Sequence, residues 1–334
     1  MPVTFRDLIT QNKRQTAVLV MVFILFTAAV VMVLSLAILA YIHPDAVRRL
    51  DWSRSLLYGG IAAAVAGAFA VGSYYSGDSV ILGITGAKEI QKQDDPQLFN
   101  VVEEMAIAAG VPMPRVYLMY DDALNAFATG RDPKHAAVAI TTGLRSRLTR
   151  DELQGVMAHE MAHVRNFDIR LMMMLAVLVG LVVMLCDLFW QMMWYAPRGG
   201  SSSDRDRKDS GGGNFLVIIL MVVAIILALI APFLAQIIQL AVSRNREFLA
   251  DATAVQFTRN PLGLANALRK LEADPIELKN ANRGTAHMFI TNPVKKFRQK
   301  ASSMFSSHPP TEERIARLDA LAHEYPEELP QGKA

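Results

Sequence analysis

Four long apolar runs constrain the fold of this chain more than any other feature. They comprise residues 17–41, 55–75, 171–195 and 215–242. Each can supply the roughly 20 residues that a transmembrane helix needs, and a helix satisfies its own backbone hydrogen bonds within lipid. The second run is rich in Gly and Ala, which suits close helix packing in lipid but is also compatible with a buried element of a soluble domain. The sequence therefore predicts an α-helical membrane protein with four transmembrane helices.

The rest of the chain has ordinary globular composition. Hydrophobic residues make up 52% of the 334, and the mean hydropathy is +0.25, as expected for a membrane protein that carries a soluble part. The run 17–41 exceeds the apolar core of a signal peptide, about 7–15 residues, so it is expected to remain as an anchor. A net charge of +3 without a basic stripe argues against a nucleic-acid partner. Cys186 is the only cysteine, which excludes an intrachain disulfide.

The apolar runs divide the chain into four segments. Residues 1–75 hold the first two expected transmembrane helices, and residues 171–242 hold the other two, joined by a Gly-, Ser- and charge-rich loop at 196–214 that is expected to be flexible. Residues 76–170 and 243–334 are the soluble segments. Strands are expected at 115–120 and 136–141, and helices at 96–110, 150–164, 246–258, 261–274 and 309–323. The soluble part is therefore predicted to have a mainly helical α+β fold with a small β-sheet.

The strongest chemical signal is the tract HEMAH, which runs from His159 to His163. It lies in a predicted helix that opens with a capping box formed by Thr149 and Glu152. Residues four apart share a face of a helix, so both imidazoles can bind one zinc ion. Glu160 then lies where it can accept a proton from an attacking water. So short a pattern also occurs by chance, but its helical context favours the metal-binding interpretation.

The third metal ligand is expected from a later helix. One extended form of the pattern has a further His six residues after the second, but this chain has Ile169 there. Glu247 is the candidate, and Asp251 lies four residues on, so the two carboxylates share a helical face. One can bind the metal while the other accepts the free ring N–H of a ligand histidine. Taken alone, the stretch around Glu247 and Asp251 is more typical of a charged helix at a membrane surface. If Glu247 is not the third metal ligand, Asp168 and Glu152 are the alternative candidates.

Three tracts in a fixed order resemble a known family. HEMAHVRNFD begins at His159, SRNREFLADATA at Ser243 and SSHPPTEERIARL at Ser306. With two apolar runs before the first tract and two after it, they resemble the HtpX-type membrane metalloproteases, which are gluzincins related to the CAAX prenyl protease and the mitochondrial Oma-type protease. The resemblance implies a gluzincin-type metallopeptidase domain with one Zn2+ per chain, bound by His159, His163 and Glu247.

The resemblance also implies roles for residues that do not bind the metal. The tract NAFATG would lie at a sheet edge that pairs with the substrate backbone, which makes Asn125 and Ala126 substrate contacts; a plain turn is the competing interpretation. His308 and Arg314 would face the zinc ion and stabilise the oxyanion of the tetrahedral intermediate, each such donor being worth roughly 3–4 kcal/mol. Asp168 also matches the family's pattern, with a structural role.

These features together predict a zinc-dependent endopeptidase anchored in a membrane. Because the expected ligands come from both soluble segments, these segments must share one side of the membrane, and two intervening spans satisfy this. A modest bias of Lys and Arg favours the cytoplasmic side. The resemblance implies a multi-pass protein of the bacterial cytoplasmic (inner) membrane that acts in membrane-protein quality control and the stress response. Its expected partners are protein or peptide substrates, above all membrane proteins, and the lipid bilayer.

Two other functions fit some of these features. A catalytically inactive membrane scaffold could keep zinc for stability, but a structural zinc site is normally closed by four protein ligands, and only three are found here beside Glu160. A small transporter with a soluble domain would usually carry polar or broken helices at mid-membrane. The four runs hold almost no charge at mid-span, so both alternatives are disfavoured.

Overall fold

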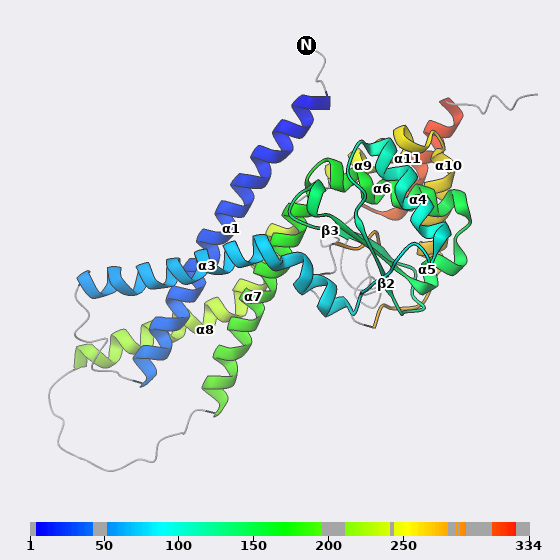
Figure 1. Ribbon diagram of the computed structural model, residues 1–334. Coiled ribbons are helices and arrows are strands. Elements are labelled where there is room, and N and C mark those ends of the chain that lie inside the picture. The colour runs from blue at the N-terminus through cyan, green and yellow to red at the C-terminus, as the bar shows by residue number, and fades with distance from the viewer. Residues whose placement is uncertain are drawn as a thin grey trace, which may run out of the picture. The chain divides into compact units, whose positions relative to one another are not determined.

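The computed structural model describes residues 5–42, 52–195, 211–240, 244–279, 285, 288–291 and 309–324. It is mainly helical with one small sheet (Figure 1). The chain divides into two compact units. The first, called here the sheet unit, comprises Met1–Thr16, Tyr74–Ala176 and Gln239–Ala334. The second, the helix unit, comprises Ala17–Ser73 and Val177–Ile238.

Four long helices supply the helix unit. They are α1 (Phe5–Ile42), α3 (Trp52–Thr85), α7 (Asp168–Tyr195) and α8 (Gly211–Leu240), and they cover nearly all of the four apolar runs. Helix α8 begins inside the loop expected at 196–214, because a helix nucleated in an apolar run extends into neighbouring residues at little cost. Among the described residues, two stretches are long and apolar enough to cross a membrane, Ala17–Ile38 and Asp168–Gln191, and a shorter apolar stretch, Met221–Leu234, lies in α8.

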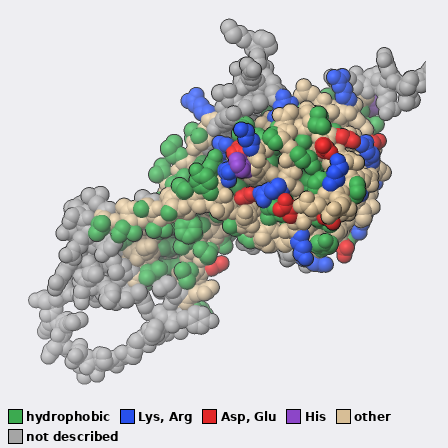
Figure 2. All heavy atoms as spheres, in the orientation of Figure 1, with side chains coloured by type: hydrophobic (Ala, Val, Ile, Leu, Met, Phe, Trp, Pro, Cys, Tyr) green, Lys and Arg blue, Asp and Glu red, His purple; other side chains and the backbone are tan. Residues whose placement is uncertain are grey.

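Many exposed side chains of these helices are large and apolar. Leu25, Leu57 and Phe233 are each more than 60% exposed, and hydrophobic side chains predominate over the described part of this unit in Figure 2. On the sheet unit, by contrast, Figure 2 shows basic and acidic side chains dispersed over the surface. Extended exposed apolar surface is unfavourable in water and typical of surface that contacts lipid or another protein.

The sheet unit contains four strands in the order β1-β2-β4-β3. They are β1 (Lys88–Glu89), β2 (Arg115–Met119), β3 (Ala126–Thr129) and β4 (Ala137–Thr141). Strands β2 and β4 are parallel and confirm the two strands expected from the sequence, whereas the other two pairs are antiparallel. Strand β3 falls within the tract NAFATG, which only the family resemblance placed at a sheet edge; all four of its residues are buried, so it shows no alternation of apolar and polar residues. It lies at one edge of the sheet.

Helix α6 (Arg150–Arg165) is the central helix of the sheet unit. It contacts β3 and three helices: α4 (Pro96–Ala109), α9 (Arg244–Thr258) and α10 (Pro261–Ala273). Helix α11 (Thr311–Glu324) packs on α9 and α10. Two short helices, η1 (Pro133–His135) and α5 (Thr142–Arg147), precede and follow β4 in the chain. The expected capping box is present, since Thr149 and Glu152 each accept a backbone N–H from the other. Every residue from Gly155 to Val164 is buried, so the polar side chains of α6 need partners in the core.

Two glycines let α6 and α10 meet backbone to backbone. A Cβ on Gly155 would lie 2.6 Å from the Leu264 nitrogen, and one on Gly263 would lie 2.7 Å from the Asp151 carbonyl oxygen. No side chain fits at these separations in a close-packed interior. Because α6 precedes α7 and α8 in the chain and α10 follows them, this contact joins the two soluble sequence segments.

Candidate metal centre

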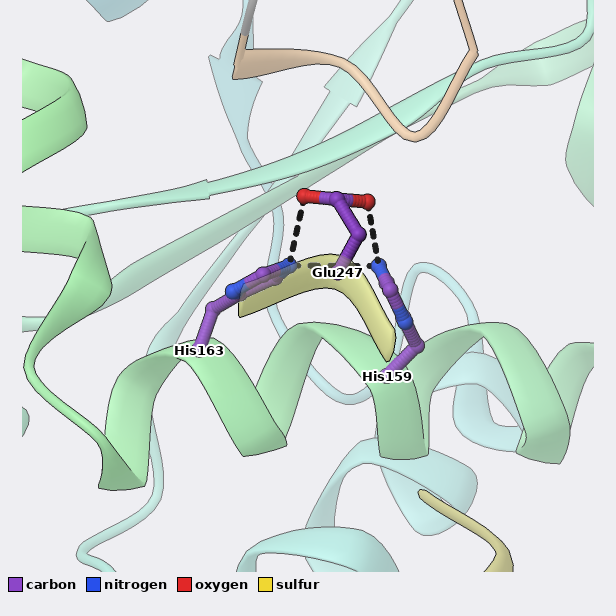
Figure 3. A group of neighbouring side chains, drawn as sticks. All are labelled: His159, His163 and Glu247. Atoms are coloured by element: carbon purple, nitrogen blue, oxygen red, sulfur yellow. Dashed lines mark hydrogen bonds and ion pairs between the residues drawn. The ribbon is translucent and has the colours of Figure 1, made fainter. Parts of the chain in front are cut away.

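Three side chains from two helices converge in the core of the sheet unit. His159 and His163 come from α6 and Glu247 from α9, and Figure 3 shows both imidazoles directed toward the Glu247 carboxylate. The Nε2 atoms of the two histidines are 3.2 Å apart. Glu247 Oε1 lies 3.5 Å from His163 Nε2, and Oε2 lies 3.7 Å from His159 Nε2. The three residues predicted to bind the metal are therefore brought together and buried.

These separations fit a shared metal ion better than direct hydrogen bonds. Two ligand atoms that are each about 2.0–2.1 Å from a tetrahedral zinc ion lie roughly 3.3–3.4 Å from one another. The histidine–carboxylate distances of 3.5 and 3.7 Å are too long for good hydrogen bonds. Two imidazole nitrogens and one carboxylate oxygen also form a donor set that zinc uses in catalytic sites, where a fourth position stays open. The donor set therefore fits zinc.

A carboxylate lies against the second ring nitrogen of His159. Asp251 Oδ1 is 2.9 Å from His159 Nδ1, and Arg314 donates to both carboxylate oxygens of Asp251, at 2.7 and 2.8 Å. Burial raises the pKa of Asp251, but the charge and hydrogen bonds of Arg314 outweigh it and bring the pKa to about 2. The ionised carboxylate can thus accept the ring N–H of His159, which is the contact expected for Asp251.

Arg314 lies beside His159 and holds Asp251. Its side chain is 1% exposed; Nη1 donates to the Ile290 carbonyl at 3.2 Å, and Nη2 lies 3.4 Å from His159 Nδ1. Burial would lower the pKa of Arg314, but the surrounding carboxylates, Asp251 first among them, raise it, so the guanidinium keeps its charge. Its action on an oxyanion stays a prediction. His308, expected to share that role, lies outside the described residues.

Glu160 is buried and contacts the edge strand. Burial raises the pKa of its carboxyl to about 7, although the charge of His163 opposes this shift. The backbone N–H of Ala128, in β3, lies near the same carboxyl group and acts to lower its pKa. A group whose pKa lies near neutrality can both accept and return a proton at physiological pH, which is the role predicted for Glu160.

The two imidazoles lie in different electrostatic surroundings. Burial lowers the pKa of His159 to about 4, against the opposing hydrogen bond to Asp251. Burial also disfavours a charged His163, but its hydrogen bond to Asp168 and the charge of Glu247 outweigh this and raise the pKa to about 9. The negative charge around His163 favours a cation in this part of the site.

The edge of β3 beside Glu160 is partly covered by the chain itself. Ala126 and Ala128 are two residues apart in the strand, so their backbone groups point to the same edge. The Ala128 N–H reaches Glu160, whereas the Ala126 carbonyl accepts the N–H of Ile290 at 3.0 Å. A substrate strand that paired with this edge would meet Ile290 at Ala126.

Ile290 belongs to a short segment, residues 288–291, called here the cover segment. The side-chain amide of Asn125 donates to the carbonyl of Thr291 at 3.1 Å, and the ring of Phe289 packs edge-on against Phe127 with centroids 5.1 Å apart. Both predicted substrate contacts, Asn125 and Ala126, are therefore engaged by the cover segment. Sequence reasoning left residues 274–307 unassigned, and the apolar triplet MFI within that polar stretch was the available signal.

The fold and the site together define a class, the metallopeptidases: two histidines on one helix and a glutamate on a later helix are placed where they could hold a metal ion, with a buried Glu beside them. Residues 92–322 match the model of the family described as "Peptidase family M48". The chain belongs to peptidase family M48, among its HtpX-type members.

The known relatives cover most of the chain. A "Protease HtpX homolog" of Lactobacillus helveticus is 42% identical over 94% of this chain and 98% of the relative. One of Caldanaerobacter subterraneus subsp. tengcongensis is 46% identical over 75% of this chain and 80% of the relative. Among solved structures, the crystal structure of S. mikatae Ste24p aligns with a TM-score of 0.45 at 20% identity, over 86% of this chain and 65% of that one.

Proposed function

We propose that this metallopeptidase is a zinc-dependent endopeptidase that is anchored in a membrane by four helices and cleaves membrane or misfolded proteins. The observation that carries the proposal is the convergence of His159, His163 and Glu247 with Glu160 buried beside them. A bound zinc ion would polarise the scissile carbonyl and make water a better nucleophile at neutral pH. Glu160 would accept the water's proton and return it to the leaving amine.

The substrate is proposed to bind as an extended strand along the open edge of β3. Peptides that add a strand to a sheet edge gain main-chain hydrogen bonds without a fixed side-chain sequence. The packing of α6 against β3, with the Ala128 N–H near Glu160, supports this placement because a backbone bound there would pass beside the proton acceptor. Pairing as far as Ala126 would require the cover segment to move.

The proposed membrane arrangement has four spans, formed by α1, α3, α7 and α8. Their lengths of 38, 34, 28 and 30 residues all exceed the roughly 20 that a span needs. With two spans between them, both soluble segments would lie on one side, and the bias of Lys and Arg supports the cytoplasm. We place the protein in the bacterial inner membrane, with a role in quality control and the stress response that rests on its membership among HtpX-type proteases.

The test uses the purified full-length protein in detergent with casein as substrate. Cleavage is expected to stop after treatment with 1,10-phenanthroline and to return when zinc is added back, with about one zinc per chain by elemental analysis. Cleavage that continues at full rate in the metal-free protein would overturn the proposal.

A further inference from the structure

The second ligand histidine has its own buried carboxylate–arginine pair. His163 Nδ1 lies 3.2 Å from Asp168 Oδ2, and Arg246 Nη1 donates to Asp168 Oδ1 at 2.6 Å. The side chains of Asp168 and Arg246 are 0% and 5% exposed. This chain of contacts repeats on His163 what Asp251 and Arg314 do for His159.

The geometry shows which ring nitrogen each partner takes. His163 Nε2 faces the cluster, 3.2 Å from His159 Nε2 and 3.5 Å from Glu247 Oε1. The other nitrogen, Nδ1, faces Asp168. A carboxylate at Nδ1 keeps the proton there and leaves the Nε2 lone pair directed at the metal position, because the partner of one ring nitrogen fixes the tautomer and orientation of the ring.

Arg246 pairs with the buried carboxylate of Asp168. A carboxylate with no solvent exposure is unfavourable unless it is paired and hydrogen-bonded. Arg246 supplies the charge, and it directly precedes Glu247 in α9, so the same helical turn delivers the third ligand and the partner of Asp168. Asp168 itself begins α7 after Phe167, whose φ of 62° turns the chain sharply at a residue type that rarely adopts this conformation.

We propose that Asp168 and Arg246 are positioning residues of the metal centre: Asp168 orients His163 for zinc, and Arg246 holds Asp168 in place. This inference rests on the proposed zinc-dependent function. It assigns to α7, one of the apolar helices, a residue on which the affinity of the site for metal depends.

The experiment measures zinc affinity in the full-length protein in detergent, by competition with a chromophoric chelator. Asp168→Asn is expected to weaken zinc binding roughly 10- to 100-fold, and Arg246→Gln is expected to weaken it as well, with Arg246→Lys restoring much of the loss. The double variant should bind no more weakly than Asp168→Asn alone, because Arg246 acts through Asp168. The visible absorption of the cobalt-substituted protein should shift in the same variants.

A matched pair separates this role from simple structural support. Arg145 donates to both oxygens of Asp95, at 2.6 and 3.0 Å, in the same unit. Asp95→Asn should lower thermal stability but leave zinc affinity and the cobalt spectrum unchanged.

Three outcomes count against the inference, and each can be distinguished from the others. If the wild type binds zinc and Asp168→Asn binds it within twofold with an unchanged cobalt spectrum, the positioning role is wrong. Additive losses in the double variant would likewise show that Arg246 does not act through Asp168. If the wild type itself binds no zinc, the proposed function fails and this inference fails with it.

Discussion

The single residue on which the chemistry depends most is Glu160. Glu160→Gln keeps the shape of the side chain but removes the proton acceptor, so peptidase activity should fall by at least roughly 100-fold. Zinc content should remain near that of the wild type, because Glu160 is not one of the three converging ligands. The measurement is casein cleavage beside elemental analysis of the same sample. A variant that still cleaves at nearly the wild-type rate would contradict the assigned role.

Substitutions of the two acidic residues of α9, Glu247 and Asp251, should weaken zinc binding to different extents. Glu247→Ala removes a ligand and should lower zinc occupancy sharply, whereas Asp251→Ala should weaken zinc affinity roughly 10- to 100-fold. Glu313→Ala is the control, since its carboxylate is exposed and paired with Arg317. Full occupancy in Glu247→Ala would move the third ligand elsewhere.

At the scale of elements, the cover segment decides how much of the β3 edge is open. Ile290→Pro removes the N–H that binds the Ala126 carbonyl, so extended peptides should bind more tightly and the KM for a model peptide should fall. Ile290→Val keeps the N–H and should behave like the wild type. If Ile290→Pro loses peptidase activity while its zinc content is unchanged, the cover segment forms part of the substrate-binding site and does not obstruct it.

The crossing of α6 and α10 tolerates no side chain. Gly155→Ala would place a Cβ 2.6 Å from backbone, and overpacking of this kind costs about 1–3 kcal/mol. Gly83→Ala meets nothing within 4 Å and should leave stability unchanged or slightly higher, because Ala favours helix. Thermal unfolding in detergent compares the two. Equal unfolding midpoints for Gly155→Ala and Gly83→Ala would mean that α6 and α10 can move apart without loss of stability.

The sequence was most informative where chemistry and helical periodicity coincide. HEMAH on a capped helix predicted α6, and the four-residue spacing of Glu247 and Asp251 predicted a shared face on α9. Strand β3 was expected only from the family resemblance and the cover segment was not predicted at all, because neither has a periodic pattern and their pairing joins positions more than 150 residues apart. The pairing of Asp168 with Arg246 escaped for a similar reason, since only the folded chain shows which of many charged side chains meet.

At the scale of the whole molecule, self-cleavage tests the proposed topology. A protease in detergent meets its neighbours at high local concentration, and extended chain is what an edge strand can bind. Zinc-loaded enzyme should cut itself within 274–307, outside the buried cover segment, or in the tail after residue 325. In intact membranes the loop 196–214 should be spared, because four spans place it on the opposite side.

Mass spectrometry of fragments from membrane-embedded enzyme provides the measurement, with Glu160→Gln as the inactive control. Zinc-dependent cuts inside 196–214 under these conditions would contradict the four-span arrangement and leave the chemistry untouched.

The two helices that meet at the glycine contact, α6 and α10, are made at different times during synthesis. Gly155 leaves the ribosome about 100 residues before Gly263, roughly 5–20 s earlier at ordinary translation rates. During that interval α7 and α8 are made and, in the proposed four-span arrangement, enter the membrane, while the histidine-bearing face of α6 still lacks α9 and α10. Until α9 has been made, the nascent chain therefore carries two of the three expected metal ligands. If the proposed function and topology hold, the newly made enzyme is inactive, and it gains activity only after its own helices have inserted and α9 has packed on α6.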